Sequence, residues 1–480
     1  MREVKELFID GAWTPSTGSA RIEVVSPSSE EAIGFAPDGT AADMDRAVAA
    51  ARRAFDHGPW PRMSVKERAD ILRKVAAYLR ERAGDITNLL CDEVGSPISF
   101  LRAGAGGVPT MIDLYADIGE AWSFETPRAG MVGPALIRQE PVGVVAAISP
   151  WNGPLFLMMI KTAPALVAGC TVVAKPAPET PLDAFYVAEA ALAAGLPPGV
   201  LNIVPAGREV GEHLVRHPGI DKVAFTGSTA AGRRIGAICG EQLKRCSLEL
   251  GGKSAAVVLD DATVESVVKC AIPLGLAFNN GQACAALTRI VVPRRRLDEF
   301  TDAITAAVET LKVGDPHEDA TAVGPLIAER QRIRVEGYIQ KGVQEGARLT
   351  TGGKRPPNLT KGWYVAPTVF TDVRNDMTIA QEEIFGPVGV IIPYDGGDEE
   401  AVAIANQSEY GLGGAVFSAD PDRGYEAAKR VRTGTIGVNT FYVDLKCPFG
   451  GFKASGIGRE MGVEGLQHYL ETKSLYGRAA

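Results

Sequence analysis

Residues 142–176 read VGVVAAISPWNGPLFLMMIKTAPALVAGCTVVAKP, and the order of elements in this stretch decides the fold class. Val142–Ile148 and Thr171–Lys175 are short β-rich runs. The apolar segment between them, Leu155–Ala168, is long enough for a helix. Because parallel neighbours need a crossover of this kind, the stretch predicts two parallel strands of one sheet joined by a helix.

The same alternation continues up to residue 251. The sequence predicts further strands at Leu201–Val204, Lys222–Phe225 and Ser247–Leu250, and further helices at Pro181–Ala194, Glu209–Arg216 and Ala230–Cys239. Short strands joined by helices of this length predict an open, mainly parallel sheet covered by helices. Such sheets bind ligands beyond the carboxyl ends of their strands, so we expect the site in the loops that follow the strands.

A second α/β section is expected from Ala255 to about residue 445. Its predicted strands are Ala255–Leu259, Arg289–Val292, Val388–Ile392, Gly414–Phe417 and Thr435–Asn439. We place a domain boundary near Gly251–Gly252. The N-terminal part is expected to be mostly helical, with one helix over Asp43–Phe55 and a capping box of Ser64 and Glu67 that begins another.

Composition argues against several classes of protein. The chain has 480 residues, of which 46% are hydrophobic and 22% charged, and a formal net charge of −8. These values are typical of a globular chain of two or three domains and unlike a nucleic-acid binder, which needs a basic face. The charged N-terminus does not resemble a signal peptide, and Lys161 interrupts the apolar stretch Leu155–Cys170, so no membrane association is expected. Seven cysteines without CxxC spacing and only five histidines predict reduced thiols in the cytoplasm and no metal site.

Two glycine-flanked loops carry the residue types that covalent catalysis needs. Cys284 ends the run Phe-Asn-Asn-Gly-Gln-Ala-Cys, and Glu249 begins the run Glu-Leu-Gly-Gly-Lys. Each alone has a simpler interpretation, a small buried hydrophobe for the cysteine and a surface carboxylate for the glutamate. Together they predict a nucleophile and a base for thioester chemistry. Asn152 and the backbone N–H of Cys284 are candidate donors to the oxyanion, although Asn152 could instead cap the helix that follows it.

A dinucleotide fingerprint of the GxGxxG type does not follow any predicted strand. Gly456, Gly458 and Gly462 resemble it in spacing, but no convincing strand precedes them, and we reject them. The run Phe225–Gly232 does follow a strand and open a helix. Because a helix N-terminus with glycine and serine readily holds a phosphate group, this run is the candidate phosphate site.

Taken in order, these runs resemble the aldehyde dehydrogenase superfamily along nearly the whole chain. The motifs that carry the resemblance are Pro150-Trp-Asn152, Lys175-Pro176, Phe225-Thr-Gly-Ser-Thr229 with Gly232, Glu249-Leu-Gly-Gly-Lys253, Gly281-Gln-Ala-Cys284, Glu382-Glu-Ile-Phe-Gly-Pro387, Gly434-Thr-Ile-Gly-Val-Asn439, and Pro448-Phe-Gly-Gly-Phe-Lys453 with Ser455 and Gly456. The resemblance implies an α/β fold with a coenzyme-binding domain, a catalytic domain and a small β arm for oligomerisation.

The implied domains divide the chain into three parts. Residues 1–122 and 141–251 would bind the coenzyme, residues 252–445 would form the catalytic domain, and residues 123–140 and 446–480 would form the arm and tail. The tail alternates loosely, as a strand that adds to a neighbouring sheet does. A homodimer or homotetramer is therefore expected, and the sequence does not decide between the two.

The resemblance also implies a reaction, the oxidation of an aldehyde to its carboxylic acid. Cys284 would attack the aldehyde to form a thiohemiacetal, which becomes a thioester after hydride transfer, while Asn152 holds the oxyanion. Glu249 would be the general base that activates water to hydrolyse the thioester. Lys161 and Glu460 would relay or order this proton traffic, unless they are ordinary charges on helix surfaces. Two other interpretations stay open: a semialdehyde-specific or CoA-acylating dehydrogenase, and a relative retained as a structural or binding protein.

NAD is the implied cofactor. Lys175 would face the adenosine ribose, Gly227 and Ser228 the pyrophosphate, and Glu383 the nicotinamide ribose. The other residues implied to line the cofactor cleft are Ile148, Trp151, Gly207, Gly211, Phe225, Leu250 and Phe385. The run Pro205–Gly211 is one residue shorter than the common form, so its two glycines depart most from the pattern.

One further departure bears on the choice of cofactor. Many NAD-using relatives have a glutamate three residues after the lysine, where this chain has Pro178, followed by Glu179. A proline side chain neither accepts hydrogen bonds from ribose hydroxyls nor repels a 2′-phosphate. NAD is therefore expected, and NADP stays possible.

The implied substrate tunnel is apolar. Its predicted lining consists of Phe156, Phe278 and Tyr442, together with Gly153, Leu157, Ile160, Ala283 and Val443. No arginine stands out among these residues, and burying an unpaired carboxylate is costly. We therefore expect an uncharged aliphatic or aromatic aldehyde as the small-molecule substrate, while the physiological aldehyde and its pathway are not determined.

Overall fold

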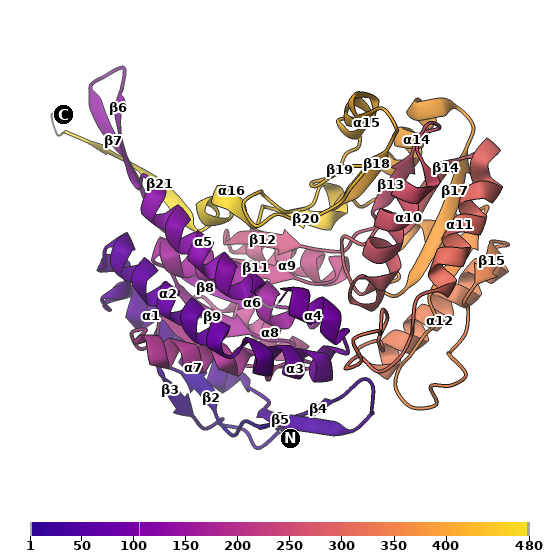
Figure 1. Ribbon diagram of the computed structural model, residues 1–480. Coiled ribbons are helices and arrows are strands. Elements are labelled where there is room, and N and C mark those ends of the chain that lie inside the picture. Colours follow the sequence, from indigo (N-terminus) through magenta and orange to yellow (C-terminus); the bar gives the residue numbers. More distant parts are fainter. Residues whose placement is uncertain (1, 105, 478–480) are drawn as a thin grey trace.

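The protein is described by a computed structural model that covers residues 2–104 and 106–477 (Figure 1). It has two large lobes, each built around one large β-sheet with helices packed against it, and a small sheet that projects away from both. The α/β fold class predicted from the alternating pattern is confirmed. Among the residues described, no helix is both long enough and apolar enough to cross a bilayer.

The first large sheet has eight strands in the order β20-β12-β11-β8-β9-β10-β2-β3. Its parallel centre consists of β8 (Val144–Ile148), β9 (Thr171–Lys175), β10 (Leu201–Ile203), β11 (Lys222–Thr226) and β12 (Arg245–Glu249). Antiparallel strands extend both edges, β2 (Leu7–Ile9) with β3 (Ala12–Thr14) on one side and β20 (Gly456–Ile457) on the other. All five predicted strands are present, with ends shifted by at most two residues.

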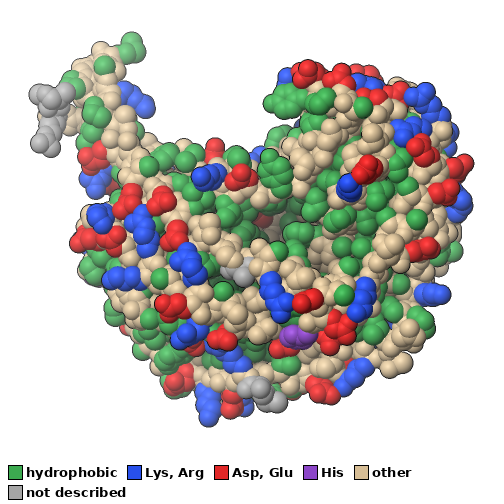
Figure 2. Space-filling view, in the orientation of Figure 1, with side chains coloured by type: hydrophobic (Ala, Val, Ile, Leu, Met, Phe, Trp, Pro, Cys, Tyr) green, Lys and Arg blue, Asp and Glu red, His purple; other side chains and the backbone are tan. Residues whose placement is uncertain are grey.

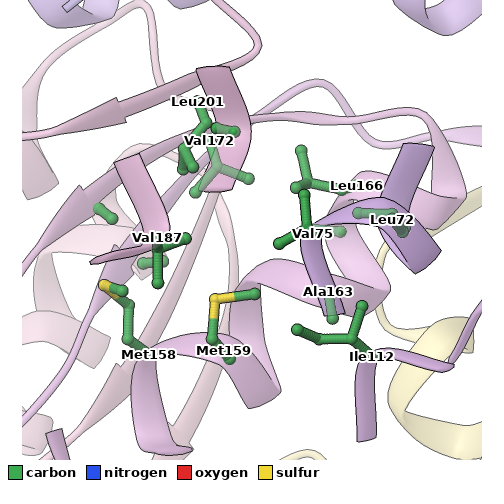
Figure 3. Packing of buried hydrophobic residues seen from close by; sticks show 14 of the residues in the cluster. Leu72, Val75, Ile112, Met158, Met159, Ala163, Leu166, Val172, Val187 and Leu201 are labelled. Carbon is green, nitrogen blue, oxygen red and sulfur yellow. The ribbon is translucent and has the colours of Figure 1, made fainter. Parts of the chain in front are cut away.

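Helices cover both faces of this sheet. One face carries α2 (Val65–Glu81), α5 (Gly107–Ala121), α6 (Pro154–Ala168) and α7 (Ala184–Ala194), and the other carries α1 (Ala41–Asp56), α8 (Arg208–Arg216) and α9 (Thr229–Glu241). Figure 3 shows the first of these layers, in which Leu72, Met159 and Val172 of β9 belong to one cluster of buried hydrophobic residues. Two shorter helices, α3 (Ala83–Val94) and α4 (Ile98–Gly104), continue the chain between α2 and α5.

The expectation of a mostly helical N-terminus is wrong for the first forty residues. Besides the β2-β3 hairpin, β1 (Arg2–Glu3), β4 (Arg21–Val25) and β5 (Ala32–Pro37) form a three-stranded sheet of their own. The signal was present in β4, where exposed and buried residues alternate with the period of a strand. The predicted helices follow, and the capping box of Ser64 and Glu67 begins α2 as expected.

The second large sheet has seven strands in the order β15-β16-β17-β14-β13-β18-β19. The five predicted strands are β13 (Ala255–Val258), β14 (Arg289–Pro293), β17 (Val388–Tyr394), β18 (Gly414–Phe417) and β19 (Gly437–Val438). Two strands were not predicted, β16 (Thr368–Thr371) and the antiparallel edge strand β15 (Arg348–Thr351). The helices of this lobe are α10 (Val264–Ile272), α11 (Leu297–Glu309), α12 (Glu329–Gln344), α13 (Thr378–Gln381), α14 (Gly397–Asn406) and α15 (Pro421–Ala428).

The projecting sheet joins two segments that lie far apart in the sequence. Strands β6 (Glu125–Ala129), β7 (Pro134–Pro141) and β21 (Leu470–Tyr476) pair antiparallel in the order β21-β7-β6, and most of their side chains are exposed (Figure 1). Helix α16 (Gly462–Gln467) leads into β21. Residues 478–480 of the predicted tail lie outside the described residues. The limits of the three domains and the oligomeric role of the arm stay predictions.

Candidate active site

The two large sheets are joined directly at the point where the site residues gather. The chain leaves β12 at Glu249, passes through Gly251 and Gly252, and enters β13 at Ala255. Glycine is required at this junction because a Cβ on Gly252 would lie 2.2 Å from the carbonyl oxygen of Cys284. A Cβ on Gly251 would lie 2.7 Å from a carboxylate oxygen of Glu383. Both close approaches bring the two halves of the molecule into contact around the predicted nucleophile.

The loop that carries Cys284 is held in an unusual backbone conformation. Asn279, Asn280 and Gly281 have φ values of 49°, 60° and 72°, in the left-handed region that few residues adopt. The Asn280 side chain supports this turn, because it donates to the carbonyls of Gly95 and Pro325, each at 2.9 Å. Such backbone conformations persist only where surrounding contacts impose them. The loop is therefore a rigid support for Cys284.

Asn152 belongs to the same network. Its amide nitrogen donates to the carbonyl of Gln282 at 2.9 Å, and its own carbonyl accepts from the side chain of Asn279 at 2.6 Å. It does not cap α6, because the residue at that position is Gly153 and no side chain caps the helix. The helix-cap interpretation of Asn152 is therefore wrong. Asn279 and Gln282 were missed as site residues, although the adjacent asparagines in the cysteine motif were a visible signal.

Cys284 is partly accessible, but its thiol lies in a poorly solvated place. Burial raises the pKa of the Cys284 thiol to about 12, and the carboxyl groups of Glu383 and Glu249 act in the same direction. Backbone N–H groups at Cys284 and Ala285 act against this rise. The thiol is therefore protonated at neutral pH, and its attack on a substrate requires a proton acceptor.

Glu249 is nearly completely buried, with 3% of its surface exposed. Neither of its carboxyl oxygens has a hydrogen-bond partner among the residues described. Burial raises the pKa of Glu249 well above its usual range, and the neighbouring carboxyl of Glu460 adds to this effect. A Cβ on Gly450 would lie 2.8 Å from one Glu249 oxygen, so glycine is needed beside the carboxyl. Glu249 is therefore not a solvated surface carboxylate, and its raised pKa suits a proton acceptor.

Lys161 and Glu460 form a buried ion pair next to it. The Lys161 amino group lies 2.5 Å from a Glu460 oxygen and donates to the hydroxyl of Thr226 at 2.5 Å. The Lys161 side chain is 0% exposed and that of Glu460 6%. The interpretation of these residues as ordinary helix-surface charges is therefore wrong. Lys161 lies on α6 and Thr226 ends β11, so the pair links the first lobe to the segment before α16.

The loops after β9 and β11 contain the predicted adenosine and phosphate residues. Lys175 is buried and donates to the carbonyls of Pro176 at 3.0 Å and Ala206 at 2.7 Å. Burial lowers the pKa of Lys175 to about 8. Ser228 caps the thirteen-residue helix α9 through the N–H of Ala231. The N-terminus of a helix this long favours a phosphate group.

The smaller predicted cofactor residues support these loops. Gly211 lies against the Lys175 side chain, where a Cβ would lie 3.3 Å from its methylenes, and Gly207 has open space where its Cβ would be. Ile148, Phe225 and Leu250 pack in the hydrophobic core beneath the loops. A Cβ on Gly227 would lie 2.4 Å from the Phe225 ring, so this aromatic residue fixes the backbone at the phosphate site.

The Glu383–Phe385 segment lies across from these loops and is held by α12. Glu383 accepts from the N–H of Gly252 at 3.0 Å, and burial raises the pKa of its carboxyl to about 7. Arg334 donates to the Glu383 carbonyl at 2.6 Å, and Gln331 donates to the Phe385 carbonyl at 2.7 Å. Sequence reasoning missed Arg334 and Gln331, because no motif around them marks them as support for a loop fifty residues away.

Trp151 and Phe385 come together from the two lobes. Their rings lie 5.3 Å apart at an interplanar angle of 89°, an edge-to-face contact. The carboxyl ends of the strands of the first large sheet and the facing Glu383–Phe385 segment thus supply an aromatic pair, a buried lysine, a capped helix N-terminus and a carboxyl. This donor set fits a dinucleotide, which presents an aromatic ring, ribose hydroxyls and a pyrophosphate. Within the described ranges, no cluster of three His, Cys, Asp or Glu side chains could hold a metal ion.

The predicted substrate residues lie at the surface of this region or close below it. The Phe278 ring contacts Phe100 of α4 at 4.9 Å, and Phe156 is half-buried on α6. Tyr442 is exposed on a groove of about 370 Å³ that α5 shares. That groove is lined by Thr110, Leu114, Tyr442, Val443, Asp444, Leu445 and Lys446. Figure 2 shows the surface between the lobes hollowed, with many hydrophobic side chains around the hollow. The contribution of α4 and α5 was not predicted.

A second hollow lies away from Cys284. It has about 800 Å³ and is lined by Val142, Pro218, Ile220, Asp221, Gln242, Leu243, Lys244, Arg245 and Glu471, at the base of the projecting sheet. None of the predicted site residues lines it. Its size therefore does not identify the functional site, which is marked by its chemistry.

Comparison with known proteins gives one consistent result. The chain matches the description "Aldehyde dehydrogenase family" over residues 13–475. It is 47% identical to geranial dehydrogenase of Castellaniella defragrans over 98% of both chains, and 40% identical to 3-succinoylsemialdehyde-pyridine dehydrogenase of a Pseudomonas species over 99% of both.

Solved structures agree with this result. An aldehyde dehydrogenase of Mycobacterium tuberculosis, complexed with NAD+, superposes with a TM-score of 0.96 at 48% identity, covering 99% of this chain and 98% of the other. Aldehyde dehydrogenase C of Pseudomonas syringae, a variant complexed with NAD+ and octanal, gives 0.92 at 39% identity, covering 98% and 96%. The resemblance seen in the motifs is confirmed, and the chain belongs to the aldehyde dehydrogenase family.

Proposed function

We propose that this protein oxidises an uncharged aldehyde to its carboxylic acid with NAD, through a thioester on Cys284. The observation that carries the proposal is the contact between the Cys284 loop and the segment after β12, the strand that ends at the buried Glu249. Among the described residues, the Glu249 carboxyl has no hydrogen-bond partner. A bound NAD would supply the acceptor for the hydride of the substrate carbon. The related enzyme from M. tuberculosis was crystallised with NAD+.

Attack by Cys284 Sγ on the aldehyde carbon forms a carbon–sulfur bond and places negative charge on the oxygen. The Cys284 backbone N–H and the Asn152 amide are the proposed donors to that oxygen. Asn152 already lies against the cysteine loop, and its amide would exchange the Gln282 carbonyl for the substrate oxygen. Because the thiol is protonated at neutral pH, its proton must pass to solvent as the carbon–sulfur bond forms.

Hydrolysis of the thioester is the proposed task of Glu249. A water molecule that loses its proton to the Glu249 carboxylate attacks the acyl carbon, and the carbon–sulfur bond breaks to release the acid and the thiol. A raised pKa suits this role because it places the base near the operating pH. Glu460 raises the pKa of Glu249 and Lys161 lowers it. The buried Lys161–Glu460 pair therefore affects how readily Glu249 releases the proton that it takes from water.

The cofactor would be held by residues from both lobes. Lys175, Gly207 and Gly211 would take the adenosine end, Gly227 and Ser228 the pyrophosphate, and Glu383 the nicotinamide ribose. Trp151, Phe385, Ile148, Phe225 and Leu250 would line or support the cleft. NAD is the proposed nucleotide, as in the complexes of several related structures.

The substrate class follows from the apolar residues around the hollow. Phe156, Phe278 and Tyr442 are the proposed contacts, and none of these three side chains could pair with the carboxylate of a semialdehyde. Lys446 lies on the same groove as Tyr442, together with Asp444. The relatives named for geranial and crystallised with octanal fit this class. A relative named for a semialdehyde keeps the semialdehyde-specific function as the second candidate.

The projecting sheet suggests a role for a second copy of the chain. Its outer strands β6 and β21 are largely exposed, and Met131, Val132 and Tyr476 present large apolar side chains to solvent. Exposed strand edges are commonly covered in the native assembly. We propose a homodimer or homotetramer that buries this arm. The seven free cysteines favour a cytoplasmic location.

A substrate panel tests the proposal. With NAD, octanal and geranial should give a higher kcat/KM than succinic semialdehyde, measured by absorbance at 340 nm and by acid formation. Added CoA should leave the product unchanged as free acid. Much higher kcat/KM for succinic semialdehyde would contradict the uncharged substrate class, and a CoA thioester as product would contradict hydrolysis by Glu249.

A further inference from the structure

The segment that leads into α4 lies against the loop of the nucleophile. The carbonyl of Gly95 accepts a hydrogen bond from the side chain of Asn280 at 2.9 Å. The hydroxyl of Ser96 donates to the side-chain oxygen of Asn279. Both contacts are buried, and Figure 1 shows α4 on the side of the first lobe that faces the second. The start of α4 is therefore attached to the strained backbone that precedes the nucleophile.

An aromatic pair extends this attachment to the proposed substrate contact Phe278. Its ring centroid lies 4.9 Å from that of Phe100 on α4, and the interplanar angle is 76°, an edge-to-face contact. Phe278 is 40% exposed, so part of its ring is free to contact a ligand. Phe100 is half-buried. Because rotation of the Phe278 ring would break the perpendicular contact, Phe100 holds that ring in one orientation.

Helix α4 is also attached to the second lobe. The N–H of Ile98 donates to the carbonyl of Pro316 at 2.7 Å, and the guanidinium of Arg102 pairs with the carboxylate of Asp319. Ile98 is 1% exposed, so the start of the helix is held by packing as well. Phe100 lies between these two attachments in the sequence. Its ring is therefore a fixed support for Phe278.

We propose that Phe100 is a positioning residue that favours planar, conjugated aldehydes by fixing the ring of Phe278. The inference rests on the proposed function, in which Phe278 contacts the substrate. A planar chain packs well on an aromatic ring in only a few orientations, so it gains most from a ring that is already held in place. A flexible alkyl chain adapts to many ring orientations and gains mainly from burial of its apolar surface. A fixed ring therefore separates the two kinds of aldehyde.

The test compares cinnamaldehyde with octanal in steady-state kinetics with NAD. Phe100→Leu removes the ring and should raise KM for cinnamaldehyde by about fivefold, while KM for octanal changes by less than about twofold. The kcat values should stay the same, because the lost contact supports the bound substrate and the transition state equally. Phe100→Tyr keeps the ring and should keep the wild-type ratio of the two KM values. Ser99→Ala, at an exposed position of the same helix, is the matched control.

A double-mutant cycle tests whether Phe100 acts through Phe278. Phe278→Leu should change the ratio of the two KM values in the same direction as Phe100→Leu. The double variant should show little further change, since both substitutions remove the same contact. Additive effects of the two substitutions would contradict the inference. Phe100→Met carries the same expectations and replaces Phe100→Leu if that variant does not fold.

Two other results would overturn the inference and leave the proposed function intact. An equal rise in KM for both aldehydes would show that Phe100 supports the fold without affecting selectivity. Unchanged KM values in Phe100→Leu, with both aldehydes still oxidised, would show that the Phe278 ring does not depend on its partner. A wild-type protein that oxidises neither aldehyde would overturn the proposed function and this inference together.

Discussion

The loop of Cys284 and the strand end of Glu249 lie against each other but are built in opposite ways. In the loop, Asn279 and Asn280 hold strained backbone with hydrogen bonds to three other segments. At the strand end, a buried carboxyl has two oxygens without partners among the described residues. Buried polar groups are usually paired, so an unpaired one is a candidate for function. The nucleophile is positioned by the protein, whereas the base is left free to bind a proton or a water molecule.

Removing the nucleophile should have the largest effect on activity. Cys284→Ala should reduce turnover by about 10⁴-fold or more, because no other group can carry the acyl intermediate. The measurement is NADH formation with octanal, together with the intact mass of the protein during turnover. Cys447→Ala, at an exposed cysteine, is the control and should keep full activity. An acyl adduct found elsewhere than on Cys284 in the wild type would refute the thioester route.

Removing the base should separate the two halves of the reaction. Glu249→Gln keeps the shape of the side chain and should slow thioester hydrolysis by about 10²–10⁴-fold, so one equivalent of NADH forms rapidly before turnover stalls. The acyl-enzyme should accumulate and be visible by mass. If the variant instead slowed the first hydride transfer and accumulated no adduct, Glu249 would not be the hydrolytic base.

The pH dependence gives a second readout of the same residue. Because burial raises the pKa of Glu249 well above its usual range, the carboxyl ionises as pH rises, and wild-type hydrolysis should become faster over that range. The variant should lose this limb of the profile. Retention of the limb would assign it to another group.

A smaller effect on activity is expected from a substitution that destabilises the Cys284 loop and leaves the reacting groups in place. Asn280→Gly removes hydrogen bonds to Gly95, Pro325 and Gly324, and should cost about 3 kcal/mol of unfolding free energy and part of kcat. Asn280→Ala should cost about 1 kcal/mol more, because alanine is strained at φ 60°. Urea unfolding and kcat measured on both variants separate the two causes. Unchanged stability in both would show that the loop does not depend on this side chain.

The smallest effect on activity is expected at a second place where carboxyls are buried. Glu93 and Asp183 are both at most 1% exposed, and burial raises the pKa of Asp183 to about 7. An acid whose pKa is raised in the folded state stabilises the fold below its unfolded pKa, and this contribution is lost as pH rises through about 7. Between pH 3.8 and about 7, the free energy of unfolding should fall by up to about 1.4 kcal/mol per pH unit for each proton that the folded state holds.

Asp183→Asn should flatten that dependence and leave kcat unchanged. The measurement is Tm between pH 5 and pH 8, with Glu93→Gln as the matched variant. An equally steep dependence in both variants would show that the pair is not its source. This acid pair would then differ from Glu249, whose burial is expected to matter for catalysis.

Sequence reasoning predicted much of the fold because its signals are local. The strands from β8 to β12 follow from runs of β-branched residues at regular spacing, and the helices between them from apolar periodicity. Strands β15 and β16 were missed because each has only four residues, too few to show a clear pattern. Strand β4 was missed because its alternation spans only five residues. Pairing with a neighbour, rather than the local sequence, stabilises such strands.

The candidate site divides in the same way. Cys284, Glu249 and Asn152 could be identified as chemical types in glycine-flanked loops. Arg334 and Gln331, which hold the Glu383–Phe385 segment, could not, because hydrogen bonds to backbone carbonyls leave no sequence motif.

The sequence by itself determined the chemical groups, the order of strands and helices, and the family. Only the tertiary structure decided that Glu249 is buried with no hydrogen-bond partner among the described residues, and that Lys161 pairs with Glu460 across 299 positions. The physical reason is range. Periodicity and turn chemistry act between residues a few positions apart, whereas burial and ion pairing depend on which distant segments the fold brings together.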